Sequence, residues 1–145
     1  MSNIEQRIAD IEARFAISEL RSKYSWHTVR AQKPELIELF TEDGVFENWR
    51  TEGDAPVVVT GRKALAQYFD RMRPARRIPM ATNEVTTING DRAEGSCVMF
   101  AMGEEEFCGH YIDSFEKCNG VWLFKVRRYY PYWPMYKPDA QRRQP

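Results

Sequence analysis

The first thirty residues carry apolar side chains at roughly helical spacing. No proline or glycine interrupts the chain between Ile4 and Ala31, and this pattern predicts one long helix. The apolar positions that define it are Ile4, Ile8, Ile11, Phe15, Leu20 and Tyr24. A second, short helix is expected to begin at Pro34, which suits a first helical turn, and to carry apolar side chains as far as Phe40. Turn residues at 41–44 would end it.

Shorter apolar runs then predict strands at 45–49 and 57–59 and a helix from Arg62 to Arg71. After Pro74, four longer segments, 80–88, 92–102, 107–118 and 121–130, have the residue types of strands. Asn89-Gly90 and Asn119-Gly120 suit hairpin turns between them, because both residues of such a turn tolerate positive φ. Helices followed by an antiparallel meander predict an α+β fold, with the helices on one face of a curved sheet.

Composition narrows the class of protein. We expect residues 1–145 to form one domain, with 137–145 as a loosely ordered tail. The 21 basic and 21 acidic residues cancel, which argues against nucleic acid or an acidic membrane as a partner. No apolar run is long enough to span a bilayer, and charges occupy the place of a signal peptide's apolar stretch, so we expect a cytoplasmic protein. The three cysteines are expected to be reduced, and without a metal-binding or nucleotide-binding motif we expect no metal and no cofactor.

Five segments, taken in order, resemble the SnoaL-like branch of the nuclear transport factor 2-like superfamily, which includes scytalone dehydratase and bile acid 7α-dehydratase. They are ISELRSKYSW, ELIELFTEDGVFENW, GRKALAQYF, TNEVTTINGDRA and GHYIDSFEKCNGVWLFKVRR. The resemblance covers most of the chain. It implies a cystatin-like α+β barrel, in which a curved antiparallel sheet wraps as a cone around the long helix and encloses a cavity for substrate. In relatives a C-terminal segment often covers the mouth of that cavity.

Two positions depart from the pattern of the dehydratases that the chain resembles. Those proteins have an aspartate five residues after the position that Tyr24 matches, where this chain has Val29. They have a histidine four residues before the position of Asn83, where this chain has Pro79. The family's catalytic pair therefore cannot be transferred, and either other residues carry the chemistry or none do.

Four residues are candidates for catalysis. The long helix places Tyr24 and His27 on one stripe, which the resemblance directs inward, and an imidazole is suited to proton transfer near neutral pH. Strand alternation places Tyr111 and Asp113 on one face, also directed inward by the resemblance. Tyr111 could donate a hydrogen bond to an oxyanion, and a buried Asp113 could act as acid or base. The alternatives are that His27 caps the rim of the cone or is hydrogen-bonded at the helix surface, and that Asp113 pairs with an arginine such as Arg50 or Arg127.

Further side chains are candidates to bind substrate, either as polar groups that hold an oxygen or as aromatic rings that stack on it. They are Thr28, Phe46, Asn48, Arg50, Tyr68, Asn83, Arg127, Tyr130 and Trp133. Two prolines interrupt the aromatic run from Tyr129 to Tyr136, which excludes a regular helix or a central strand there. This run is expected to form a lid over the cavity or a subunit contact.

The sequence therefore predicts a cofactor-independent lyase or isomerase with dehydratase-like proton transfer, acting on a small aromatic or polycyclic apolar molecule. The alternative is a non-catalytic small-molecule-binding or assembly module of the same fold. A third reading, the small subunit of a ring-hydroxylating oxygenase, shares the fold, but the chain is short for it. A homodimer or homotrimer is expected, because the exposed sheet surface of this fold generally pairs with another copy.

Overall fold

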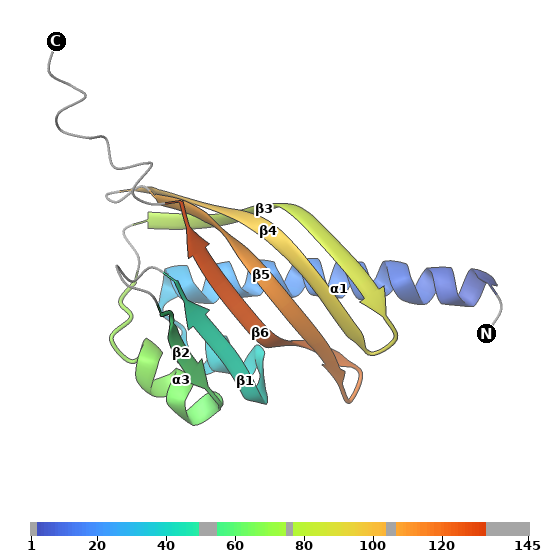
Figure 1. Ribbon diagram of the computed structural model, residues 1–145, viewed down its shortest axis with the longest axis horizontal. Helices are drawn as coiled ribbons and strands as arrows, with labels where there is room; N and C mark the ends of the chain where they lie inside the picture. Colours follow the sequence, from blue (N-terminus) through green and yellow to red (C-terminus); the bar gives the residue numbers. More distant parts are fainter. Residues whose placement is uncertain (1–2, 50–54, 75–76, 104–106, 133–145) are drawn as a thin grey trace, which may run out of the picture.

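A long helix lies across one face of a six-stranded sheet (Figure 1). The computed structural model describes residues 3–49, 55–74, 77–103 and 107–132. The helix, α1 (Asn3–Arg30), confirms the predicted one, and its N-terminal end extends beyond the sheet (Figure 1). Its buried side chains recur every three or four residues, as a helix that packs one face on a core requires. They are Ala13, Ile17, Leu20, Arg21 and Tyr24.

Two short helices lie close to one end of the sheet. The first, α2 (Lys33–Glu38), has Pro34 in its first turn as predicted, but it ends before Leu39. The expectation that this helix reaches Phe40 was wrong, because Phe124 donates its backbone N–H to the Leu39 carbonyl and the chain enters the sheet at Phe40. The second, α3 (Arg62–Phe69), packs beside the first two strands (Figure 1).

The sheet is mixed and open. Its strands are β1 (Phe40–Asn48), β2 (Val57–Thr60), β3 (Arg77–Asn89), β4 (Arg92–Gly103), β5 (Phe107–Cys118) and β6 (Val121–Pro131). Their order is β2-β1-β6-β5-β4-β3, so that within the described residues β2 and β3 form the two edges and the sheet does not close. The all-antiparallel expectation was wrong at one pair, since β1 runs parallel to β6.

The two predicted hairpin turns differ in backbone conformation. Asn119 (φ 50°) and Gly120 (φ 82°) both adopt positive φ, as predicted. In the other hairpin Asn89 pairs with Arg92, so Gly90 and Asp91 are the central residues, and of these Gly90 alone has positive φ. The prediction of positive φ at Asn89 was therefore wrong, and the turn is of the kind that needs glycine at its first central position.

Two β-bulges change which side chains face the helix. In β3 the register shifts between Thr82 and Val85, with Asn83 at φ 53° between them. In β6, Phe124 and Val126 face consecutive residues of β5, so Lys125 is the extra residue. Because a bulge reverses strand alternation, Phe124 and Arg127 are both buried on the helix side of the sheet.

Aromatic side chains dominate the core between α1 and the sheet. Phe40, Phe115 and Phe124 are almost completely buried, and the ring of Phe124 lies 5.7 Å from that of Tyr24 on α1.

The three cysteines are free thiols. Within the described ranges, none of the helices is long and apolar enough to cross a membrane.

Candidate functional site

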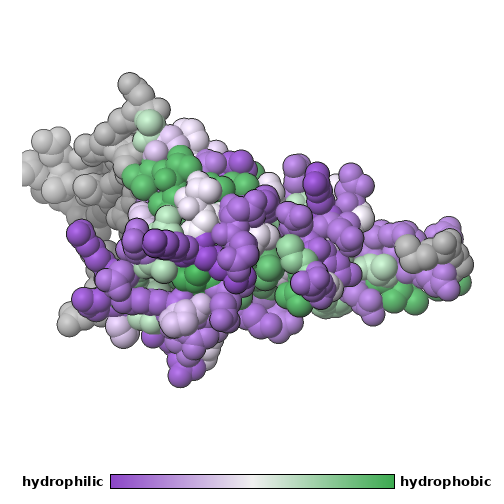
Figure 2. Space-filling model, turned by 90° about the horizontal axis from the view of Figure 1, so that it is seen from below, coloured by the Kyte–Doolittle hydropathy of each residue, from purple (hydrophilic) through white to green (hydrophobic). Residues whose placement is uncertain are grey.

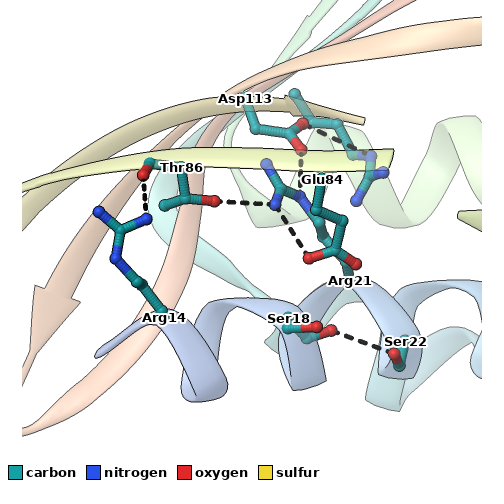
Figure 3. Close-up of polar contacts among 8 residues, drawn as sticks. Arg14, Ser18, Arg21, Ser22, Glu84, Thr86 and Asp113 are labelled. Atoms are coloured by element: carbon teal, nitrogen blue, oxygen red, sulfur yellow. Dashed lines mark hydrogen bonds and ion pairs between the residues drawn. The ribbon is translucent and has the colours of Figure 1, made fainter. Parts of the chain in front are cut away.

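Four charged side chains meet between α1 and the sheet, and we refer to Arg21, Glu84, Asp113 and Arg127 as the buried charge cluster. Arg21, Asp113 and Arg127 are 0%, 1% and 0% exposed, whereas the Glu84 side chain is 25% exposed at the edge of the cluster. Arg21 Nε donates to Asp113 Oδ2 at 3.2 Å, and its Nη1 donates to Glu84 Oε2 at 3.2 Å and Thr86 Oγ1 at 3.0 Å (Figure 3). On the other side of Asp113, Oδ1 lies 3.7 Å from Arg127 Nε.

Local sequence explains how Arg21 is accommodated. It lies in the buried stripe of α1, between Ile17 and Tyr24, where a helix normally carries apolar residues. Opposite it on β4 is Gly95, and a Cβ atom there would lie 2.8 Å from Arg21 Nη2 and 2.2 Å from the Val85 carbonyl oxygen. The absence of a side chain at Gly95 therefore leaves space for the guanidinium group between α1 and the sheet.

Arg127 lies in a cage of aromatic rings. Its guanidinium carbon is 3.6 Å from the ring centre of Tyr111, 4.2 Å from that of Tyr24 and 4.5 Å from that of Phe124. Cation–π contacts of this kind stabilise a desolvated cation. Within the part of the chain that the structure describes, however, none of its three guanidinium nitrogens makes a hydrogen bond of good geometry, and the nearest polar groups are the Tyr111 hydroxyl and Asp113 Oδ1. Buried donors without an acceptor are costly, so these nitrogens mark a place where a ligand oxygen would be stabilised.

Burial sets the protonation of the side chains around Arg127. It raises the pKa of Tyr111 to about 12, and that of Tyr24 well above its ordinary value. Both phenols are therefore protonated at neutral pH and can donate hydrogen bonds. Burial also raises the pKa of Asp113, against the opposing effect of Arg127 and Arg21. For Arg127 itself burial disfavours the charge, but the Asp113 carboxylate and the two tyrosines raise its pKa, so it remains a cation.

The structure brings three of the four predicted catalytic residues together. The Arg127 side chain lies next to Tyr24, Tyr111 and Asp113. The odd-numbered face of β5 is buried as predicted. His27 is not among them. Its Nδ1 lies 3.0 Å from Gln32 Oε1, and its side chain lines a separate groove between α1, α2 and β6. This geometry matches the alternative interpretation of His27, a histidine that is hydrogen-bonded at the helix surface.

Three of the predicted substrate-binding residues contact one another between β1 and α3. Phe46 is buried, and its ring lies 5.6 Å from that of Tyr68. Asn48 Nδ2 donates to the Tyr68 hydroxyl at 2.9 Å. Two further candidates have local roles instead, since Thr28 donates its hydroxyl to the Tyr24 carbonyl at 2.8 Å, and the exposed Asn83 forms the bulge in β3.

The C-terminal aromatic residues divide between the two faces of β6. The prediction that the prolines exclude a central strand was wrong as far as Pro131, because the central strand β6 includes Tyr129 and Tyr130 and ends at Pro131. Tyr129 is buried on the inner face, whereas the ring of Tyr130 stacks between Trp49, at 5.2 Å, and His110, at 5.0 Å, on the outer face. The candidates Arg50 and Trp133, and the remainder of the proposed lid, lie outside the described residues.

Two members of the buried charge cluster were missed by sequence reasoning. Arg21 carried a usable signal, because a charge within the apolar stripe of α1 is unusual and needs a partner. Glu84 carried none, since its direction depends on the bulge in β3. Among the described residues, no group of histidine, cysteine, aspartate and glutamate side chains is arranged to hold a metal ion.

Comparisons with known proteins agree with the observed fold. A model of the SnoaL-like domain family matches residues 9–128. None of the curated proteins compared with the chain matches it. A variant of Rv3472, a protein of unknown function from Mycobacterium tuberculosis, is 26% identical with a TM-score of 0.75, and the match covers 90% of this chain and 76% of that one.

Two further structures share the fold at lower identity. A candidate scytalone dehydratase from Novosphingobium aromaticivorans is 21% identical with a TM-score of 0.70, over 84% of this chain and 85% of that one. The hexachlorocyclohexane dehydrochlorinase LinA-type3 from Novosphingobium barchaimii is 17% identical with a TM-score of 0.73, over 88% and 91%. Other solved structures with this arrangement are described as cystatin-like. Because the family model covers most of its length, the chain belongs to the SnoaL-like domain family.

Proposed function

We propose that the buried charge cluster and the aromatic cage form the active site of a cofactor-independent lyase or isomerase, which removes a proton next to the carbonyl group of a small aromatic or polycyclic molecule. One observation carries the proposal: Arg127 is fully buried among aromatic rings with three guanidinium nitrogens that lack hydrogen-bond partners among the described residues. A preformed cation with free donors stabilises an oxygen that becomes negative in the transition state. The surrounding rings suit an apolar or planar substrate.

The proposed reaction uses three neighbouring groups. Asp113 Oδ1, which has no hydrogen-bond partner among the described residues, takes a proton from the carbon next to the carbonyl. The electron pair of that C–H bond moves to the carbonyl oxygen, and Arg127 and the neutral phenol of Tyr111 stabilise the resulting enolate. The proton then returns to another carbon, which is isomerisation, or a group β to the carbonyl leaves with its electron pair, which is elimination.

Two features support this chemistry over other reactions of the fold. Burial raises the pKa of Asp113, and a carboxylate with a raised pKa is a stronger proton acceptor. Two of the similar structures are named for elimination reactions, the loss of water in a candidate scytalone dehydratase and the loss of hydrogen chloride in a dehydrochlorinase. We assign the proton transfer to Asp113 and not to His27, because His27 lies in a separate groove.

Enolate formation is tested directly by hydrogen exchange. The purified protein is incubated with 2-tetralone, a small bicyclic aromatic ketone, in D2O, and deuterium incorporation is followed by mass spectrometry. We expect Arg127→Met and Asp113→Asn each to slow exchange by about 100-fold or more. Arg128→Met is the matched control, because Arg128 is the next residue on β6 but pairs with Glu47 on the outer face, at 3.2 Å.

Three outcomes are informative. Exchange that depends on Arg127 and Asp113 but not on Arg128, with unchanged circular dichroism, supports the proposal. Equal exchange rates in all four proteins would refute the assignment of the site. If 2-tetralone binds in a manner that needs Arg127, yet no exchange occurs above the solvent rate, the protein is a small-molecule-binding module and not an enzyme of this class.

A further inference from the structure

A stripe of exposed apolar side chains runs along α1, on another side of the helix from its buried stripe. Ile4, Ile8, Ile11 and Phe15 are 66%, 51%, 51% and 74% exposed. They alternate at spacings of four and three residues, and Ser18 and Ser22 continue the same spacing toward the middle of the helix. Since a helix has 3.6 residues per turn, these positions form one continuous line, which we call the outer seam of α1.

The outer seam begins at the N-terminal end of α1. The N-terminal part of the helix extends beyond the sheet (Figure 1), and hydrophobic surface follows one side of this narrow end (Figure 2). A helix that faces solvent normally carries polar residues on the side away from the core. A line of isoleucine and phenylalanine in this position is typical of a surface that another helix covers.

Charged residues flank the outer seam with opposite signs on its two sides. In the heptad notation of coiled coils, the seam occupies positions a and d, Glu5, Glu12 and Glu19 occupy e, and Arg7 and Arg14 occupy g. In a parallel pair of such helices, position g of one helix meets position e of the next heptad in the other. In an antiparallel pair, g meets g and e meets e, which would oppose like charges. The charge pattern therefore favours a second copy of this helix in parallel orientation.

A groove lies beside the outer seam. It has a volume of about 360 Å³ and lies between α1 and β3, where Ile11, Phe15 and Ser18 face Glu84 and Thr86. Arg14 donates a hydrogen bond to the Thr86 carbonyl, which holds this flank of the helix against the sheet. The small Ser18 side chain permits two helices to approach closely where the body of the molecule begins.

We propose that the outer seam is a parallel helix–helix interface between two copies of this chain. Arg7 of each copy would pair with Glu12 of the second copy, and Ile4, Ile8, Ile11 and Phe15 would each meet the same residue across a two-fold axis. This surface differs from the outer face of the sheet, which is the surface that the family resemblance implies for association. The interface is independent of the chemistry proposed for Arg127.

The size of the assembly tests whether the outer seam is an interface. Sedimentation velocity is measured over a range of concentrations for the unsubstituted chain, Ile8→Lys and Val121→Lys. Val121 is the matched control, because it is an apolar residue of similar exposure, 58% against 51% for Ile8, and lies on β6, outside the outer seam. We expect Ile8→Lys to weaken dimerisation about tenfold or more while Val121→Lys leaves it unchanged. A chain that is monomeric throughout, or a dimer that Ile8→Lys leaves unaltered, would overturn the proposal.

Orientation is tested by charge exchange and by cross-linking. Arg7→Glu should weaken the dimer, and Arg7→Glu combined with Glu12→Arg should restore it, since the exchanged pair is again complementary. In a parallel pair Ile11 meets itself, so Ile11→Cys should give a disulfide-linked dimer under mild oxidation, while the unsubstituted chain with its three native cysteines should not. Failure of the double variant to recover the dimer, together with no cross-link at position 11, would overturn the parallel arrangement.

Discussion

Removal of the Arg21 guanidinium is the sharpest test of the buried charge cluster. Arg21→Met keeps the length and the apolar stem of the side chain but deletes its hydrogen bonds to Asp113, Glu84 and Thr86. The Asp113 side chain is fully buried and would keep Arg127, at 3.7 Å, as its one remaining cation in the cluster. The substitution therefore leaves a buried carboxylate short of donors and does not create a large cavity.

The expected loss of stability is large for a single side chain. Breaking a buried ion pair by removing one partner costs about 3–5 kcal/mol, out of a total free energy of unfolding of roughly 5–15 kcal/mol for a domain of ordinary size. Asp113→Asn removes the opposing charge. The double variant Arg21→Met/Asp113→Asn should therefore lose less than the sum of the two single losses, by roughly 0.5–3 kcal/mol.

Urea unfolding followed by circular dichroism measures these losses. Lys23→Met is the matched control on the same helix, because Lys23 Nζ lies 3.0 Å from Glu19 Oε1 in a pair whose side chains are both more than half exposed. Its expected loss is at most about 0.5 kcal/mol. If Arg21→Met does not fold, Arg21→Lys, which keeps the charge but not the planar fork, gives a smaller loss that can still be measured. Equal losses for Arg21→Met and Lys23→Met would refute the reasoning.

Two further predictions concern the same region. Gly95→Ala should destabilise the fold by about 1–3 kcal/mol, because the added Cβ would lie 2.2 Å from the Val85 carbonyl oxygen and 2.8 Å from Arg21 Nη2. If urea unfolding shows no loss, neither group needs the space at Gly95. For Tyr111, burial raises the pKa from 10.0 to about 12, so the folded state keeps the phenol protonated after the unfolded chain has lost its proton. Its contribution to stability should thus be complete below pH 10 and decline as the pH rises toward 12, and tyrosinate absorbance that is complete well below pH 12 in the folded protein would contradict this.

Most of the fold could be predicted from patterns that depend on local physics. The long N-terminal helix, the four long strands and the Asn119-Gly120 turn follow from periodicity and from the backbone preferences of glycine and asparagine. The end of α2 could not be predicted, because Leu39 and Phe40 have the apolar character of the helix before them. Phe40 joins β1 through tertiary contacts, and the Phe124 N–H to Leu39 carbonyl bond that directs the chain there spans 85 residues.

Part of the candidate site could likewise be predicted from local sequence patterns, and part could not. Tyr111 and Asp113 follow strict alternation, so their burial on one face was predictable once the strand was recognised. Arg127 faces inward together with Phe124 only because Lys125 is inserted as a bulge, and a bulge has no reliable signal in one sequence. His27 was misleading for a different reason, since a residue three positions beyond Tyr24 lies at the flank of the buried stripe, and there Gln32 accounts for one of its ring nitrogens.

The two buried arginines differ in their hydrogen bonds, and this difference indicates that the cluster has a function beyond stability. Arg21 donates to Asp113, Glu84 and Thr86, as expected of a structural guanidinium group. Arg127 is equally buried, yet within the described ranges none of its nitrogens donates a hydrogen bond. A buried cation whose nitrogens make no hydrogen bond is costly to hold, so its presence points to a benefit realised when an oxygen atom enters the cage. On this reasoning Arg127→Met should lower the free energy of unfolding by less than Arg21→Met does, because Asp113 keeps its hydrogen bond from Arg21, while it abolishes exchange. A loss as large as that of Arg21→Met would assign Arg127 to the structure of the core.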